Sequence, residues 1–80
     1  MDKVEKQLQK MPLYDRNRVM DVMEQIIHRN FSGLNRKQLT GFRKIFRVRV
    51  GNYRIIYFDD GHDIQFESVG RKNESTYNDL

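Results

Sequence analysis

The run FRVRVGNYRIIYF at residues 46–58 limits more than any other feature how this 80-residue chain can fold. In its first half, phenylalanine and valine alternate with arginine, which is the period of a strand that buries one face. Gly51 and Asn52 then interrupt the pattern before a second apolar and aromatic run begins. A Gly-Asn pair between two such runs predicts a two-residue β-hairpin loop, and glycine at the first central position favours a type II′ turn.

The short loop also predicts which residues share a face of the hairpin. A two-residue loop places Val50 opposite Tyr53 and Arg49 opposite Arg54, and side chains on one face recur at every second position. The face expected to pack on the core carries Phe46, Val48, Val50, Tyr53, Ile55 and Tyr57. The opposite face carries Arg47, Arg49 and Arg54.

Before the hairpin, the apolar residues follow helical spacing instead. They form two sets, Val4, Leu8 and Met11 in the first, and Val19, Val22, Met23, Ile26 and Ile27 in the second. The second set predicts an amphipathic helix over about residues 12–29. Asp15 is the expected N-cap, and Asn30 with Gly33 is the expected stop signal.

A third strand is expected after the hairpin. Asp59-Asp60-Gly61 predicts a second turn, and residues 62–69 predict a strand with Ile64 and Phe66 on one face. These elements predict an α+β fold, in which an N-terminal helical hairpin packs on one face of an antiparallel β-meander. The length predicts a single domain over residues 1–80.

The composition excludes several classes of site. The chain has no cysteine, so disulfides and thiolate metal sites are excluded. The charged N-terminus, MDKVEKQLQKMPLYDR, has no apolar run long enough for a signal peptide or a membrane span, which predicts a soluble, cytoplasmic protein. The HxH, HExxH, GxGxxG and Walker patterns are absent, so we expect neither a metal nor an organic cofactor.

Positive charge is concentrated in the middle of the chain. The net charge is +4, and no acidic residue occurs between Glu24 and Asp59. The basic residues of this window are Arg29, Arg36, Lys37, Arg43, Lys44, Arg47, Arg49 and Arg54. Such a block is typical of proteins that bind a phosphate backbone. A solvated basic face without a ligand and a docking surface for an acidic protein are the alternatives.

The three hairpin arginines favour the phosphate interpretation. Like charges directly opposite across two strands destabilise a sheet by ~0.2–1 kcal/mol, so the fold itself gains nothing from the pair formed by Arg49 and Arg54. Guanidinium groups donate paired hydrogen bonds to phosphate oxygens. The alternative is an exposed strand face that carries arginine to discourage aggregation, with Glu67 opposite Arg54 as an ion-pair partner.

The run FRVRVGNYRIIYFDDG, followed by IQFESVGRKNESTY, resembles the RelE/ParE superfamily of toxins from toxin-antitoxin pairs. The preceding LNRKQLTGFRKIFRVRVG is also in keeping with that family, and the most specific part is Arg-x-Arg-Val-Gly-x-Tyr-Arg-Ile-Ile-Tyr. The resemblance implies two helices packed on a twisted antiparallel sheet. Members usually open with a β-strand, whereas this chain begins at DKVEKQLQKM. Either that strand is absent or the start of this sequence lies too late, and losing the strand would expose a sheet edge and favour dimerisation or strand exchange.

The same resemblance implies a function. RelE-like members cleave messenger RNA in the ribosomal decoding site, which predicts a ribosome-dependent endoribonuclease that inhibits translation. ParE-like members instead inhibit DNA gyrase, and an inactive homologue that only binds its antitoxin is the third alternative. The implied partners are a cognate antitoxin, the ribosome and messenger RNA, with a homodimer or a heterotetramer with the antitoxin as the expected assembly.

The resemblance also implies roles for individual residues. The implied catalytic residues are Arg54, Arg71 or Lys72, and Tyr77, and the implied RNA-binding residues are Arg47 and Arg49. Arg43 and Lys44 of the basic window are further candidates for RNA binding. Attack of a ribose 2′-OH on the adjacent phosphate would build up negative charge that Arg54 and Arg71 or Lys72 stabilise, while Tyr77 stacks on a base or orients the nucleophile. Glu67 is a candidate general base, with a role as an ion-pair partner of Arg54 as its alternative.

Overall fold

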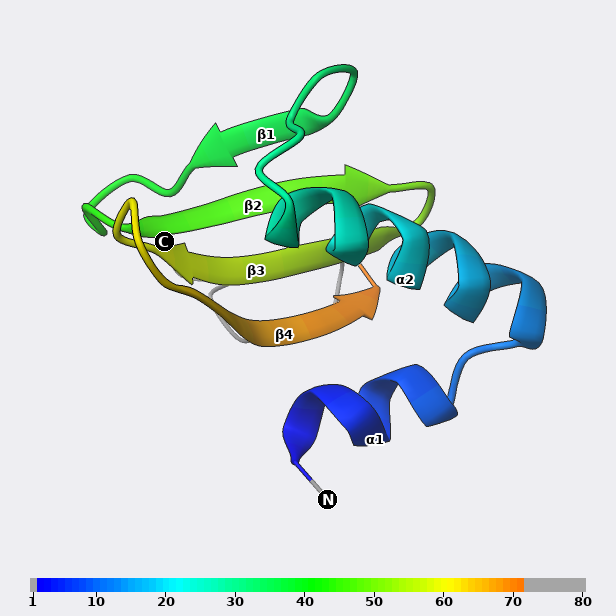
Figure 1. The fold of residues 1–80 in the computed structure, drawn as a ribbon. Coiled ribbons are helices and arrows are strands. Elements are labelled where there is room, and N and C mark those ends of the chain that lie inside the picture. The colour runs from blue at the N-terminus through cyan, green and yellow to red at the C-terminus, as the bar shows by residue number, and fades with distance from the viewer. Residues whose placement is uncertain (1, 72–80) are drawn as a thin grey trace.

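A four-stranded sheet with two helices on one side makes up the fold in the computed structural model, which describes residues 2–71 (Figure 1). The elements in chain order are α1 (Lys3–Gln9), α2 (Leu13–Ile27), β1 (Asn35–Gln38), β2 (Ile45–Val50), β3 (Tyr53–Asp59) and β4 (Ile64–Arg71). All neighbouring strands are antiparallel and follow the order of the chain. The predicted α+β architecture is confirmed.

The hairpin between β2 and β3 has the predicted register. Val50 lies opposite Tyr53, and Arg49 lies opposite Arg54. Gly51 has a φ of 58°, whereas the residue after it does not have a positive φ, as a type II′ turn requires. Because this turn fixes the pairing of β2 with β3, it also determines which residues lie on each face of the hairpin.

Strand β1 is an element that the sequence patterns did not predict. Its four residues, NRKQ, are polar, so they lack the apolar alternation that signals a half-buried strand. It pairs with β2 so that Arg36 lies opposite Val48 and Lys37 lies opposite Arg47. The sheet therefore extends one strand further than the predicted meander.

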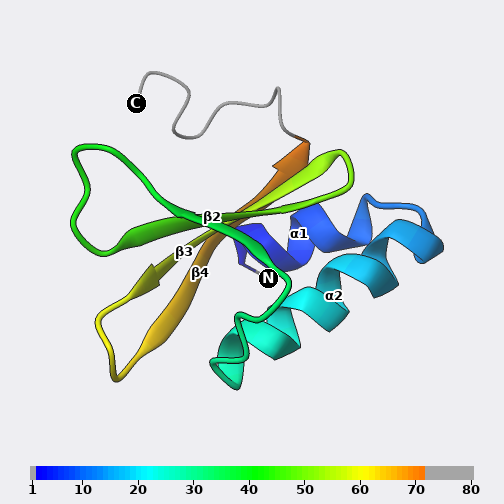
Figure 2. The same cartoon turned by 90° about the horizontal axis from the view of Figure 1, so that it is seen from above.

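The core lies between the helices and the predicted apolar face of the hairpin. Five of the six residues predicted for that face are buried, and Phe46 is half-buried against them. Helix α2 lies over β2 and β3 and contributes Val19 and Ile26, whereas α1 lies along β4 (Figure 2). This packing leaves the other face of the sheet turned away from both helices.

Both ends of α2 differ from the prediction. Pro12 occupies the N-cap position without a side-chain cap, so the expectation for Asp15 was wrong, and Asp15 instead accepts a hydrogen bond of 2.9 Å from the Tyr53 hydroxyl. At the other end the chain turns at Arg29, which has a φ of 57°, and not at Gly33. The Asn30 amide closes the helix by donating to the carbonyl of residue 25, which is the bond of a Schellman motif.

Helix α1 supplies a hydrogen-bond acceptor to the outer edge of the sheet. The Gln7 side chain accepts a hydrogen bond of 2.8 Å from the Val69 amide, and its Nε2 donates to the Ser68 hydroxyl. An edge strand otherwise presents unpaired backbone groups to other chains. Gln7 therefore covers part of the edge that was expected to be exposed.

Candidate functional site

The face of the sheet turned away from the helices, called the distal face below, gathers four basic residues. The register places Arg49 opposite Arg54 and Lys37 opposite Arg47, and alternation puts all four on the same side. On β4 the position opposite Arg54 is Gly70, which has no side chain. Three neighbouring strands thus direct positive charge to one surface.

The charges on the distal face affect one another. Burial lowers the pKa of Arg47, and the nearby charges of Arg49 and Arg54 lower it further. The Nε of Arg47 is buried and has no hydrogen-bond partner among the residues that the structure describes. Because like charges repel one another here and arginine stays protonated, an anion with several oxygens would be bound favourably.

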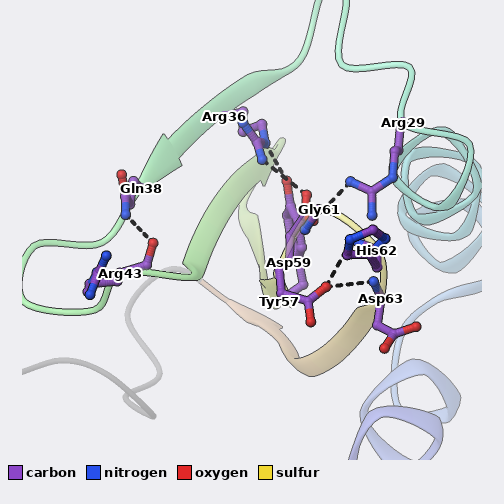
Figure 3. A network of polar contacts seen from close by, with 10 residues as sticks. Arg29, Arg36, Gln38, Arg43, Tyr57, Asp59, Gly61, His62 and Asp63 are labelled. Atoms are coloured by element: carbon purple, nitrogen blue, oxygen red, sulfur yellow. Dashed lines mark hydrogen bonds and ion pairs between the residues drawn. The ribbon is translucent and has the colours of Figure 1, made fainter.

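A second cluster accounts for two other arginines of the basic window. The Asp59 side chain is only 4% exposed, and it binds Arg29 at 2.9 Å and Arg36 at 3.3 Å, as Figure 3 shows. Burial alone would raise the pKa of Asp59, but the hydrogen bond from the Gly61 amide and the two arginines hold that pKa below its ordinary value. These contacts tie the segment after α2, through Arg29, and β1, through Arg36, to the end of β3. The predicted bounds of the second turn, 59–61, and of the third strand, 62–69, were wrong, because β3 extends to Asp59 and β4 spans Ile64–Arg71, which leaves residues 60–63 as the connection.

Aromatic rings fix the position of Arg36 within this cluster. Its guanidinium carbon lies 3.9 Å from the ring centroid of Phe46 and 4.1 Å from that of Phe31. Its Nε also donates a 2.6 Å hydrogen bond to the Tyr57 hydroxyl. Burial raises the pKa of Tyr57 although the Arg36 contact opposes that rise. These contacts give Arg36 a structural role, and its position opposite Val48 places it on the helix side of the sheet, away from the distal face.

Comparison with known proteins agrees with this architecture. No family model matches the sequence, and no curated protein matches it. A chain in the crystal structure of the RelB-RelE antitoxin-toxin complex from Methanococcus jannaschii matches with a TM-score of 0.74 and 28% identity, over 85% of this chain and 82% of that chain. The chain has the RelE-like toxin fold. This finding confirms the resemblance inferred from the hairpin motif.

The RelE-like fold brings together three of the residues that the resemblance selected, namely Arg47, Arg49 and Arg54. Lys37 joins them, and sequence reasoning missed it as a site residue because β1 was not predicted. The only available signal was a glycine-containing connection between residues 39 and 44, which is compatible with a hairpin.

Three other selected residues lie elsewhere in the RelE-like fold. Arg43 and Lys44 are exposed in the connection before β2, so the length of that strand separates them from the pair next to the turn. Arg71 lies opposite Tyr53 on the helix side of the sheet, with its guanidinium carbon 5.8 Å from the Tyr53 ring centroid. Arg71 and Arg54 therefore point to opposite faces.

Glu67 does not lie opposite Arg54, so that expectation was wrong. A β-bulge in β4 places Ser68 opposite Ile56 and Phe66 opposite Tyr57, which leaves Glu67 without a partner position. The extra residue shifts the alternation along the strand, and sequence spacing alone does not reveal such a shift. The role of Glu67 as a base stays a prediction.

The last two selected residues, Lys72 and Tyr77, lie outside the residues that the structure describes, and their roles stay predictions.

Within residues 2–71, no group of three or more histidine or acidic side chains is arranged to hold a metal ion. No helix in this part of the chain is both long and apolar enough to cross a membrane.

Proposed function

We propose that this RelE-like protein is the toxin of a type II toxin-antitoxin pair and cleaves messenger RNA on the ribosome. The observation that carries the proposal is the convergence of Arg47, Arg49 and Arg54 on the face that the helices leave uncovered. The fold does not require this arrangement, since the pairing of two arginines is unfavourable for the sheet. An RNA backbone would compensate it with phosphate oxygens.

The reaction that these residues suit is attack of a ribose 2′-OH on the adjacent 3′-phosphate. The new oxygen-phosphorus bond forms while the bond to the 5′-oxygen breaks, leaving a 2′,3′-cyclic phosphate and a 5′-hydroxyl end. Arg54 would stabilise the charge that develops on the phosphorus oxygens, and Arg47 with Arg49 would hold the backbone. Because Arg71 lies on the helix side, we assign the second charge-stabilising role to Lys72.

The proton chemistry explains why the ribosome would be needed. A positioned general base contributes ~100 to 10,000-fold to a rate. Tyr77 is assigned to stack on a base or to orient the nucleophile, and the role of Glu67 as a general base is only a prediction. Alignment of the substrate by the ribosome would then be the main source of acceleration. Cleavage of free RNA is therefore expected to be slow.

An antitoxin is the proposed protein partner. The structural neighbour is an antitoxin-toxin complex, and the net charge of +4 on this chain would speed association with an acidic partner. The mass of the purified complex would distinguish a one-to-one complex of toxin and antitoxin from a heterotetramer.

The test is a translation assay with purified ribosomes and a defined messenger, in which the 3′ ends of any fragments are mapped. The parent and the Lys6→Ala variant, which lacks an exposed lysine of α1, should cleave the messenger at codon boundaries. Arg54→Ala should lose cleavage while circular dichroism shows an intact fold. Full activity in Arg54→Ala would refute the assignment. An intact messenger with the parent, together with inhibition of gyrase supercoiling, would support the ParE-like alternative instead.

A further inference from the structure

A polar hollow lies on the helix side of the sheet, between the β2–β3 turn and α2, and is called the turn hollow below. The residues that line it include Asp15, Arg18, Gly51, Asn52, Tyr53 and Arg71. Its volume is about 140 Å³. Since each water in the liquid occupies ~30 Å³, the hollow can hold several waters or one hydrated phosphate group. Figures 1 and 2 both show the turn beside the first half of α2.

Two arginines from distant parts of the chain border the turn hollow. Arg18 comes from α2, and a Cβ added at Gly51 would lie 3.3 Å from its Nη1, so the turn glycine lets this guanidinium approach the backbone. Arg71 comes from the end of β4, where it lies beside the Tyr53 ring. Both side chains are exposed, so their donors can be reached from solvent.

The charge of the turn hollow is not balanced within the described residues. Neither Arg18 nor Arg71 takes part in an ion pair within residues 2–71. The one carboxylate that borders the hollow belongs to Asp15, and it already accepts the hydrogen bond from Tyr53. Lys10 borders the neighbouring hollow on the other side of Arg71 and adds positive charge. Two guanidinium groups against one carboxylate leave a net positive charge beside the hollow, which favours an anion with several oxygens.

The turn hollow and the distal face are connected along the chain by the two-residue turn. Arg49 and Arg54 are the first pair beyond the residues that close the turn, and they point to the distal face. Arg18 and Arg71 flank the same turn on the helix side. A single strand of nucleic acid that crosses the turn would therefore meet two arginines on each side. This arrangement favours RNA over an acidic protein as the occupant.

We propose that the turn hollow is a second phosphate-binding site, in which Arg18 and Arg71 hold a backbone phosphate of the RNA strand away from the position of cleavage. The site rests on the proposed function, because it binds the same substrate. Arg71, which lies on the helix side of the sheet, would hold RNA there and would not stabilise the charge at the position of cleavage. The site also predicts that the RNA path wraps around the end of the sheet.

The experiment compares binding of a short single-stranded RNA to the full chain and to an Arg18→Gln/Arg71→Gln variant. Affinity measured against salt concentration reports the number of phosphates contacted, with a slope of ~0.7 per phosphate for single strands. The variant should bind several-fold more weakly and show a slope shallower by ~0.7. The matched control, Lys3→Gln/Lys6→Gln, removes the same charge from α1 and should keep the parent slope.

Backbone amide NMR signals locate the contact. In the parent, RNA should shift the amides of Gly51 and Asn52 as well as those of β2, and in the Arg18→Gln/Arg71→Gln variant only the β2 shifts should remain. An unchanged slope in the variant while the parent cleaves messenger on ribosomes would overturn the turn hollow and leave the proposed function intact. No RNA-induced shift at the turn amides would overturn the turn hollow, while messenger cleavage on the ribosome tests the proposed function separately. A response of the turn amides to an acidic peptide but not to RNA would also overturn the proposal.

Discussion

Repulsion between Arg49 and Arg54 should make the sheet less stable than its sequence allows. The two residues lie opposite each other next to the turn that Val50 and Tyr53 close. In a two-residue hairpin the closing pair is hydrogen-bonded, so the next pair is of the other kind, with Cα atoms only ~4.5 Å apart. Their side chains leave the same face close together. We therefore expect an unfavourable coupling between them.

The magnitude follows from Coulomb's law with the two guanidinium groups taken to lie ~7 Å apart. Two unit charges ~7 Å apart in water repel by ~0.6 kcal/mol. At 0.01 M salt the screening length of ~30 Å leaves ~0.5 kcal/mol, whereas the ~3 Å length at 1 M leaves less than ~0.1 kcal/mol. The low-salt figure agrees with the ~0.2–1 kcal/mol typical of cross-strand pairs.

The assay is a double-mutant cycle with Arg49→Gln, Arg54→Gln and the variant that carries both changes. Urea unfolding followed by circular dichroism gives the free energy of unfolding of each protein at 0.01 M and 1 M salt. Because either single change already removes the repulsion, the double variant should gain ~0.5 kcal/mol less than the sum of the single gains at low salt. The coupling should vanish at 1 M salt.

The outcome separates a functional arrangement from a structural one. A coupling that is zero at low salt, or that favours the native state, would refute the argument that the fold gains nothing from these arginines. An unfavourable coupling together with lost messenger cleavage in Arg54→Ala would show stability being sacrificed for RNA binding.

Further predictions concern the contacts that hold the fold. Asp59→Asn should destabilise the protein by ~2–3 kcal/mol, since it leaves two arginines without their buried partner. Because the pKa of Asp59 lies below its ordinary value of 3.8, this stabilisation is present above that pH and lost below it, so urea unfolding at falling pH should bring the parent toward the variant; a constant difference would contradict the ion-pair account. Arg29→Ala should be less stable than Arg29→Gly by ~1 kcal/mol in the same assay, because only glycine adopts the positive φ without strain, and equal stabilities would rule that strain out. Gln7→Ala should cost ~1 kcal/mol and speed hydrogen exchange at the Val69 amide, whereas Lys6→Ala should do neither; unchanged exchange in Gln7→Ala would show that the edge is protected by something else.

The sequence determined the hairpin and the residues on its faces. Alternation of apolar residues with arginine and the Gly-Asn pair act between neighbours, so the turn type, the register and the convergence of Arg47, Arg49 and Arg54 were predicted. Helical spacing likewise predicted α2 to within two residues at its end. These signals act between residues close together in the chain, so local geometry is enough to predict the hairpin and α2.

Only the tertiary structure could sort the basic residues by role. Arg29 and Arg36 look like the other cations of the window, yet both are held by Asp59, which is 30 and 23 positions away. Strand β1 carries no apolar pattern, so the position of Lys37 depends on pairing with β2. The bulge at Glu67 and the orientation of Arg71 follow from pairing between β3 and β4. Such contacts join residues far apart in the chain, and their energies depend on burial and partners that no sequence spacing contains.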